Sequence, residues 1–119
     1  MATPNLANVA TIKPFMKAGA LTTSYATLVD TPSESCFKVD SFYVSNVDGT
    51  NSATCQIEVG LNAGSGGNYA LTKGLVVPPG ATIAILTTPL YLDETDYIRG
   101  LASASSDIQW FASGTELID

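Results

Sequence analysis

Residues 52–61 alternate strictly between apolar and polar types, and this pattern constrains the fold more than any other in the chain. One set would face inward, and it comprises Ala53, Cys55, Ile57, Val59 and Leu61. The other set would face solvent, and it comprises Thr54, Gln56, Glu58 and Gly60. Side chains of a strand point to opposite faces in turn, so this period of two predicts a half-buried β-strand. A second layer must cover its apolar face.

Further β-type segments recur along the 119 residues, separated by turn-forming residues. Strands are predicted at residues 20–30, 37–47, 69–73, 82–88, 89–92 (a short edge strand), 96–104 and 107–118. No amphipathic helix stands out. Seven or eight short strands with frequent turns are typical of an antiparallel β-sandwich. We therefore expect an all-β fold, either immunoglobulin-like or jelly-roll-like.

Turn residues suggest how these strands pair. Asp48-Gly49 favours the positive φ values of a tight turn, so residues 37–47 and 52–61 are expected to form a hairpin. The last two strands, joined near residues 105–107, are expected to form a second pair. Gly114 inside the last strand indicates a bulge or a close backbone approach. Strand 37–47 has apolar residues at both odd and even positions, so both of its faces are predicted to be covered by other parts of the protein or by a partner.

Residues 1–18 are weakly patterned, and Pro4 and Pro14 limit regular structure there. They could form an arm that reaches a neighbouring subunit or a segment that covers the sandwich edge. Residues 19–119 are expected to form a single β-sandwich domain, since the chain has the length of one domain.

Charged residues make up 13% of the chain, about half the usual share. Such a surface suits contact with other proteins. Five basic residues against eleven acidic ones, with the bases scattered, argue against binding nucleic acid or an anionic membrane. No signal peptide or transmembrane run is apparent, so the chain is expected to stay in a cytoplasm or to assemble there into something larger.

Catalytic chemistry has little support. The chain has no histidine, and therefore lacks the commonest general base. Cys36 and Cys55 are interpreted as buried thiols. The predicted hairpin holds them too far apart to bridge within it, so a disulfide would need Cys36 to fold back over the sheet. The acidic run 93–96 does not match an EF-hand and is interpreted as a turn. We expect no enzyme activity, cofactor or metal.

The adjacent aromatic residues Trp110 and Phe111 would point to opposite faces of the last strand. Both could be buried, or the exposed one could anchor a subunit contact or stack on a sugar ring. Together with Phe15 and Tyr43, they are the candidate subunit-contact residues.

An order of elements covering about two-thirds of the chain resembles a known class of proteins. The hairpin FYVSNVDGTNSATCQIEV precedes the strand NYALTKG, the turn and strand VPPGATIAIL, and the terminal LYLDETDYIRGLASASSDIQWFASGTELI. This order resembles small virion structural proteins of tailed bacteriophages.

The resemblance implies a non-enzymatic virion protein, assembled in the host cytoplasm. A capsid decoration or cement protein that binds the major capsid protein, as a homo-oligomer with a trimer favoured, is the leading expectation. A neck, tail or fibre-attachment component is the alternative, and a carbohydrate-binding β-sandwich is a more distant one.

Overall fold

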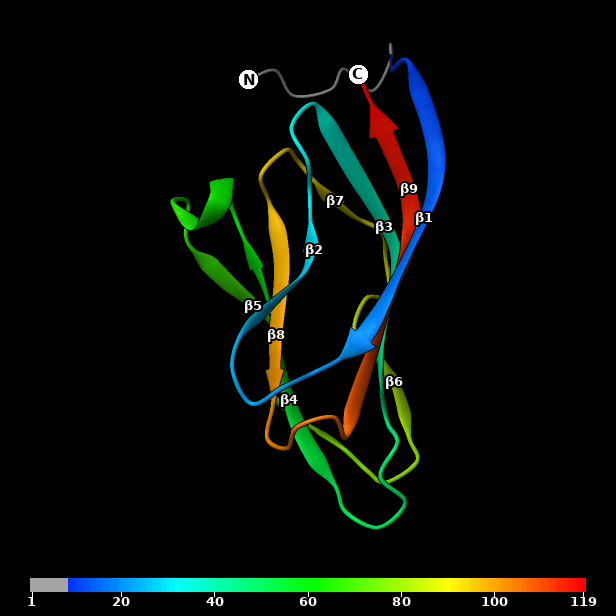
Figure 1. The fold of residues 1–119 in the computed structure, drawn as a ribbon, viewed down its shortest axis with the longest axis vertical. Helices are drawn as coiled ribbons and strands as arrows, with labels where there is room; N and C mark the ends of the chain where they lie inside the picture. Colours follow the sequence, from blue (N-terminus) through cyan, green and yellow to red (C-terminus); the bar gives the residue numbers. More distant parts are fainter. Residues whose placement is uncertain (1–8) are drawn as a thin grey trace.

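Two antiparallel β-sheets stack face to face in the computed structural model, which describes residues 9–119 (Figure 1). Sheet A contains β1 (Thr11–Ala20), β3 (Ser35–Asn46), β6 (Thr82–Ala84), β7 (Leu90–Leu92) and β9 (Ile108–Ile118). Sheet B contains β2 (Ala26–Asp30), β4 (Ala53–Gly60), β5 (Asn68–Val77) and β8 (Tyr97–Ala102). A 3-10 turn, η1 (Asn62–Gly64), lies between β4 and β5. The predicted all-β sandwich is confirmed, with nine strands among residues 9–119 rather than seven or eight.

The strands pair in a nested order. β1 pairs with β9, β2 with β8, β3 with both β6 and β7, and β4 with β5. The chain therefore runs as one long antiparallel hairpin, which is folded over so that its successive arms lie alternately in the two sheets. This is the topology of a jelly roll, one of the two architectures expected from the sequence.

The prediction of a hairpin at Asp48-Gly49 is wrong, because the two strands that this turn joins, β3 and β4, lie in different sheets. The connecting loop crosses from one sheet to the other and is held by its own side chains. The Asp48 carboxylate accepts the N–H groups of Thr50 (2.8 Å) and Asn51 (3.3 Å). Buried Asn46 donates its amide to the carbonyls of Asn51 and Val77. The predicted pairing of the last two strands is wrong for the same reason, since β8 and β9 belong to different sheets.

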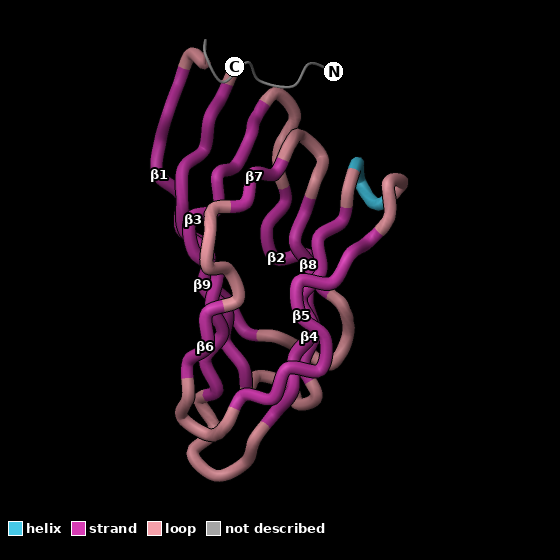
Figure 2. The backbone as a smooth tube through the Cα atoms, turned by 180° about the vertical axis from the view of Figure 1, so that it is seen from behind, coloured by secondary structure: helices cyan, strands magenta, loops and turns pink. Residues whose placement is uncertain are grey.

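Several predicted strand boundaries also shift. Residues 21–25 lie outside β2, and β5 continues to Val77. β6 ends at Ala84 because the N–H groups of Ile85 and Leu86 both turn to the carbonyl of Phe42. The following residues separate β6 from β7, and these two short strands pair with different parts of β3 (Figure 2). The prediction of a short edge strand at residues 89–92 is confirmed by β7.

The N-terminal segment enters sheet A. β1 pairs with β9 along its whole length, from Thr11 opposite Ile118 to Ala20 opposite Gln109. The boundary expected at residue 18 therefore falls inside a strand. Residues 1–8 of the predicted arm lie outside the described part of the chain.

The core lies between the two sheets, and strand 53–60 faces it as the alternation predicted. Ala53, Cys55, Ile57 and Val59 are buried, whereas Leu61 is exposed just beyond the strand. From sheet A the largest buried side chains include Phe42, Leu92, Ile108 and Trp110, and the Trp110 ring stacks on Phe42 with centroids 5.8 Å apart. No helix among residues 9–119 is long and apolar enough to cross a membrane.

Gly114 marks the closest approach of β9 to β3. It pairs with Val39, and the register between the two strands shifts between Val39 and Ser41. A Cβ atom at position 114 would collide with the carbonyl oxygen of Lys38 and crowd the N–H of Asp40. The prediction of a bulge or close approach at Gly114 is confirmed.

We expect Gly114→Ala to destabilise the fold by about 2–3 kcal/mol, because backbone must move to admit the methyl group. The matched control is Gly49→Ala, where an added Cβ meets nothing within 4 Å, and where the change should stay within about 0.5 kcal/mol. Urea unfolding followed by circular dichroism measures both. Equal stability of the two variants would contradict the close approach.

Candidate protein-binding face

The side of sheet A that points away from the core is a surface of mainly neutral side chains, which the strand register defines. We call it the outer face of sheet A. From β1 and β9 it contains Ile12, Pro14, Met16, Ala18, Ala20, Gln109, Phe111, Ser113, Thr115 and Leu117. From β3, β6 and β7 it contains Cys36, Lys38, Ser41, Tyr43, Ser45, Thr82, Ala84 and Tyr91.

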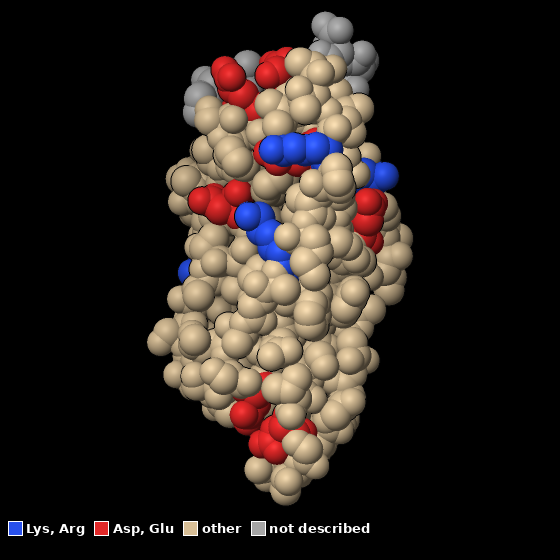
Figure 3. All heavy atoms as spheres, turned by 45° about the vertical axis from the view of Figure 1, so that its right-hand side comes forward, with Lys and Arg blue, Asp and Glu red and all other residues tan. Residues whose placement is uncertain are grey.

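Lys38 is the one charged residue in this set, and its ammonium lies 3.5 Å from the carboxylate of Asp40. Hydroxyl groups on the face pair with each other, as in the 2.8 Å contact between Ser41 and Ser113. The space-filling view shows charged atoms toward the upper part and at the lower tip, with neutral surface between them (Figure 3). A neutral face with few long side chains loses little solvation and side-chain entropy when another protein covers it.

Two of the four predicted contact residues come together on this face. Tyr43 is 38% exposed, and its ring lies 5.5 Å from that of the half-buried Phe111. Trp110 points the other way and is 6% exposed. Phe15 also faces the core side, where its ring stacks on Phe37 at 4.6 Å. A contact role therefore remains a prediction for Tyr43 and Phe111, and the other two residues line the interior of the sandwich.

Sequence reasoning missed two exposed apolar residues of β1, Ile12 at 66% and Met16 at 62%. The sequence contains the pattern of a strand here, because the apolar residues Ile12, Met16 and Ala18 occupy even positions. Lys13 and Lys17 occupy odd positions, and Lys13 forms an ion pair with Glu116 at 3.6 Å. The proline at position 14 obscured this alternation, since prolines are rare within sheets.

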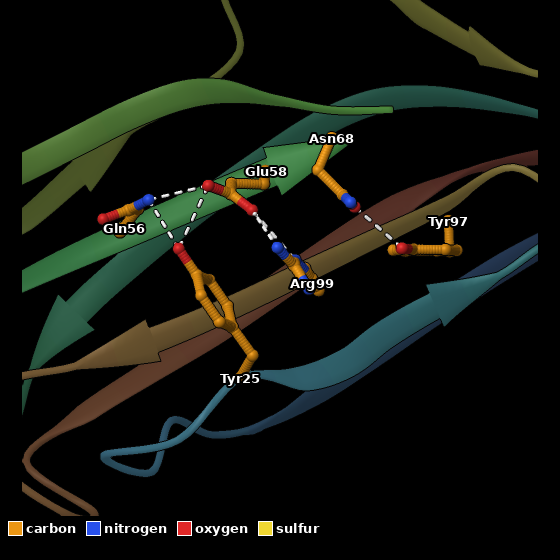
Figure 4. A network of polar contacts seen from close by, with 6 residues as sticks. All are labelled: Tyr25, Gln56, Glu58, Asn68, Tyr97 and Arg99. Atoms are coloured by element: carbon orange, nitrogen blue, oxygen red, sulfur yellow. Dashed lines mark hydrogen bonds and ion pairs between the residues drawn. The ribbon is translucent and has the colours of Figure 1, made fainter. Parts of the chain in front are cut away.

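The corresponding face of sheet B carries a network of polar side chains that bond to one another (Figure 4), and beyond it Val76 of β5 is 54% exposed. The Glu58 carboxylate accepts hydrogen bonds from Arg99 (2.9 Å), Gln56 (2.7 Å) and Tyr25 (3.0 Å). The Arg99 guanidinium also lies over the Tyr25 ring, 4.0 Å from its centroid. Burial acts to raise the pKa of Glu58, but these hydrogen bonds outweigh it and hold the pKa below its usual value.

Beside this network, the Tyr97 ring occupies the space that the absent side chain of Gly60 leaves, and its hydroxyl donates to Asn68 at 2.7 Å. These partners are all internal to the chain. The two outer faces therefore differ, because charged groups form a central network on sheet B, whereas sheet A carries mainly neutral side chains.

The cysteines are both free and buried, Cys36 in β3 and Cys55 in β4. Burial raises the pKa of the Cys55 thiol to about 11. Burial, together with the charges of Asp93 and Asp96, raises the pKa of the Cys36 thiol. Such thiols are poor nucleophiles at neutral pH. No cluster of three or more metal-binding side chains occurs among residues 9–119.

Solved structures with the same fold belong to large assemblies. A protein of Bacillus endospore appendages, described as disulfide-linked pili, aligns with 91% of this chain and 87% of its own, at a TM-score of 0.54 and 16% identity. A capsid protein of Helicobacter pylori bacteriophage KHP30 aligns with 93% of this chain and 90% of its own, at a TM-score of 0.50 and 10% identity.

The particle protein of infectious bursal disease virus aligns with 92% of this chain at a TM-score of 0.52 and 8% identity. This chain spans only 32% of that larger protein. No family model matches the chain, and no curated protein matches it. At these identities the likeness establishes the fold alone.

The Glu58–Arg99 pair should make stability depend on pH. Because the folded-state pKa of Glu58 is lowered, its contribution is present above the unfolded-state pKa and is lost as pH falls through the folded value. A double-mutant cycle with Glu58→Gln and Arg99→Met should show favourable coupling at about pH 7 that disappears near pH 2. Urea titrations at both pH values measure it. Coupling that is absent at pH 7, or unchanged at pH 2, would contradict the assignment.

The burial of both thiols predicts that they react with a thiol reagent only after unfolding. Native protein should stay unlabelled by an aromatic disulfide reagent at neutral pH and release two equivalents in denaturant. Ser52→Cys, at an exposed loop position, provides the control that reacts at once. Rapid labelling of the native wild-type protein would show that a thiol is accessible.

Proposed function

We propose that this protein is a structural subunit of a virus particle, which binds neighbouring protein chains through the outer face of sheet A. The observation that carries the proposal is the composition of this face, where apolar, aromatic and hydroxyl side chains surround one ion pair, Lys38 with Asp40. Exposed neutral patches of this kind mark surfaces that other proteins cover. The proposed role is non-enzymatic.

Within the particle, we propose a bacteriophage capsid decoration or cement protein, bound to the major capsid protein and present as a homo-oligomer. The resemblance of the sequence to small tailed-phage virion proteins supports this position. The jelly-roll topology supports it as well, because that architecture recurs in viral capsids. Many copies of the protein, each bound at a junction between capsid subunits through this neutral face, would hold the shell against internal pressure.

Two alternatives remain distinct in what they predict. A neck, tail or fibre-attachment component would be present in few copies per particle, whereas a decoration protein would be present in hundreds.

The likeness to a subunit of disulfide-linked pili favours a filament subunit as the second candidate. The sequence has two cysteines, Cys36 and Cys55, and both are buried, so a filament joined by disulfides of this chain would require one of them to become exposed.

The decisive observation is the location of the protein by cryo-electron microscopy of particles with and without it. We expect surface density at capsid junctions that disappears from particles lacking the protein, together with loss of heat resistance. An unchanged shell with a missing neck or tail would contradict the decoration role. Filaments, with no density on any particle, would contradict the virion role.

The binding face is tested by Tyr43→Glu, which places a charge in the centre of the outer face of sheet A. Binding to particles that lack the protein should weaken roughly tenfold or more, because the interface must then bury an unpaired charge. Tyr69→Glu is the matched control, since Tyr69 is 60% exposed in β5 of sheet B. Equal binding by both variants, each with wild-type stability, would place the contact elsewhere.

A further inference from the structure

The four sheet edges of the sandwich differ in their capacity to accept another strand. The β2 edge has five residues and a register shift between Thr27 and Val29. The β5 edge carries two register shifts against β4, and the remaining edge is divided between two three-residue strands, β6 and β7. β1 has ten residues in continuous register with β9. Short and bulged edges resist strand addition, so β1 is the regular edge that could accept it.

The alternation of hydrogen bonds along β1 identifies which backbone N–H and C=O groups point away from β9, toward the free edge of sheet A. The Leu21 N–H donates to the Ile108 carbonyl at 2.8 Å, and the pairs from Ala20 back to Thr11 continue this register without a shift. Bonding residues alternate in an antiparallel ladder, so the odd residues of β1 bond to β9. The even residues present their N–H and C=O groups at the free edge, and they are Ile12, Pro14, Met16, Ala18 and Ala20. In the described part of the chain, no strand pairs with this edge.

Proline divides this edge into two unequal parts. Pro14 lacks an N–H and interrupts the row of donors near the start of the strand. Met16, Ala18 and Ala20 retain both groups over the last five residues of β1, where all side chains are exposed. Strand pairing is therefore available at residues 16–20 and obstructed before them.

A depression lies beside this same stretch. Ala18, Gly19, Ala20, Gln109 and Phe111 line a hollow of about 340 Å³. It exists because the small side chains of Ala18 and Ala20 lie beside the larger Phe111 and Gln109, their partners on β9. Recognition by strand addition combines main-chain hydrogen bonds with pockets for alternate side chains, and residues 16–20 offer both.

We propose that β1 pairs antiparallel with β1 of a second copy of this chain, across a two-fold axis at Ala18. Each Ala18 then bonds to Ala18 of the second copy, and Met16 bonds to Ala20 of the second copy. Six main-chain hydrogen bonds form, and the two A sheets join into one continuous sheet. The proposal goes beyond the proposed function and holds whether or not the protein is part of a virion.

This register removes the obstacles that β1 presents to self-pairing. Lys17 faces Gly19 of the second copy, so the two Lys17 side chains avoid a direct like-charge pair. Pro14 stands opposite residue 22 of the second copy, beyond the end of β1, where no donor is needed. Lys13 likewise lies beyond the paired stretch and retains Glu116 as its partner.

The same register also supplies a side chain for the depression. Met16 of the second copy lies directly opposite Ala20, on the outer face and next to Phe111. A flexible methionine can fill a gap lined by small residues and contact an aromatic ring. Its 62% exposure in the single chain would then fall on pairing. The size of Met16 and the small residues of the hollow favour a second copy over an unrelated strand as the occupant.

Engineered cysteines test the axis. In Ala18→Cys the two Cα atoms would lie about 5.5 Å apart across the axis, within disulfide range. In Ala20→Cys the corresponding atoms would be roughly 14 Å apart. Mild oxidation should give covalent dimers of Ala18→Cys at least tenfold faster than of Ala20→Cys or of the wild type, whose own thiols are buried. Met16→Cys should crosslink only when mixed with Ala20→Cys.

A second measurement does not depend on crosslinking. Ala18→Pro removes one donor from the free edge but none from the ladder with β9, as Pro14 already does. Sedimentation should show a two-fold complex for the wild type and a monomer for Ala18→Pro, with circular dichroism confirming that both fold. A wild-type monomer at millimolar concentration, a trimer, or equal crosslinking at positions 18 and 20 would overturn the proposal. Particle binding that survives in Ala18→Pro would leave the virion role intact.

Discussion

Sheet A depends on the position of β9 between β1 and β3, which joins the last strand of the chain to its first and third. Every pair in this ladder joins residues more than sixty positions apart, from Asn46 with Ile108 to Thr11 with Ile118. The contact is close enough at Gly114 that a Cβ atom there would collide with the backbone of β3. Because β9 fixes the register of its neighbours on both sides, it decides which residues face the core and which face outward across the whole sheet.

The positions of the strands could be predicted from the sequence, but their partners could not. Alternation at residues 53–59 and the turn residues that punctuate the chain depend on local geometry, which the sequence displays directly. Asp48-Gly49 has turn chemistry in the structure too, since Asp48 binds the backbone two and three residues ahead. The same turn chemistry occurs where the chain returns as a hairpin within one sheet and where it crosses from one sheet to the other. Only the nested long-range pairing distinguishes the two, and no local pattern encodes it.

The binding face shows the same division between local and long-range information. Adjacent residues such as Trp110 and Phe111 must point to opposite sides of a strand, and the sequence indicates this. Which side is the core depends on what stacks on it, here Phe42 against Trp110. Tyr43 and Phe111 meet only because β3 and β9 are paired in this register. The hollow beside Ala18 depends in turn on β1, a strand whose apolar alternation in the sequence is interrupted by Pro14.

The unequal edges of the sandwich bear on how far such a protein can polymerise. A molecule with two regular edges can add neighbours at both, and repeated addition gives an open-ended fibre. This molecule has short, bulged or divided strands at three edges, and one regular edge at β1. A strand docked at β1 uses up the site that received it. With the proposed pairing at β1, growth by strand addition would end after a single step, because no second regular edge remains among residues 9–119.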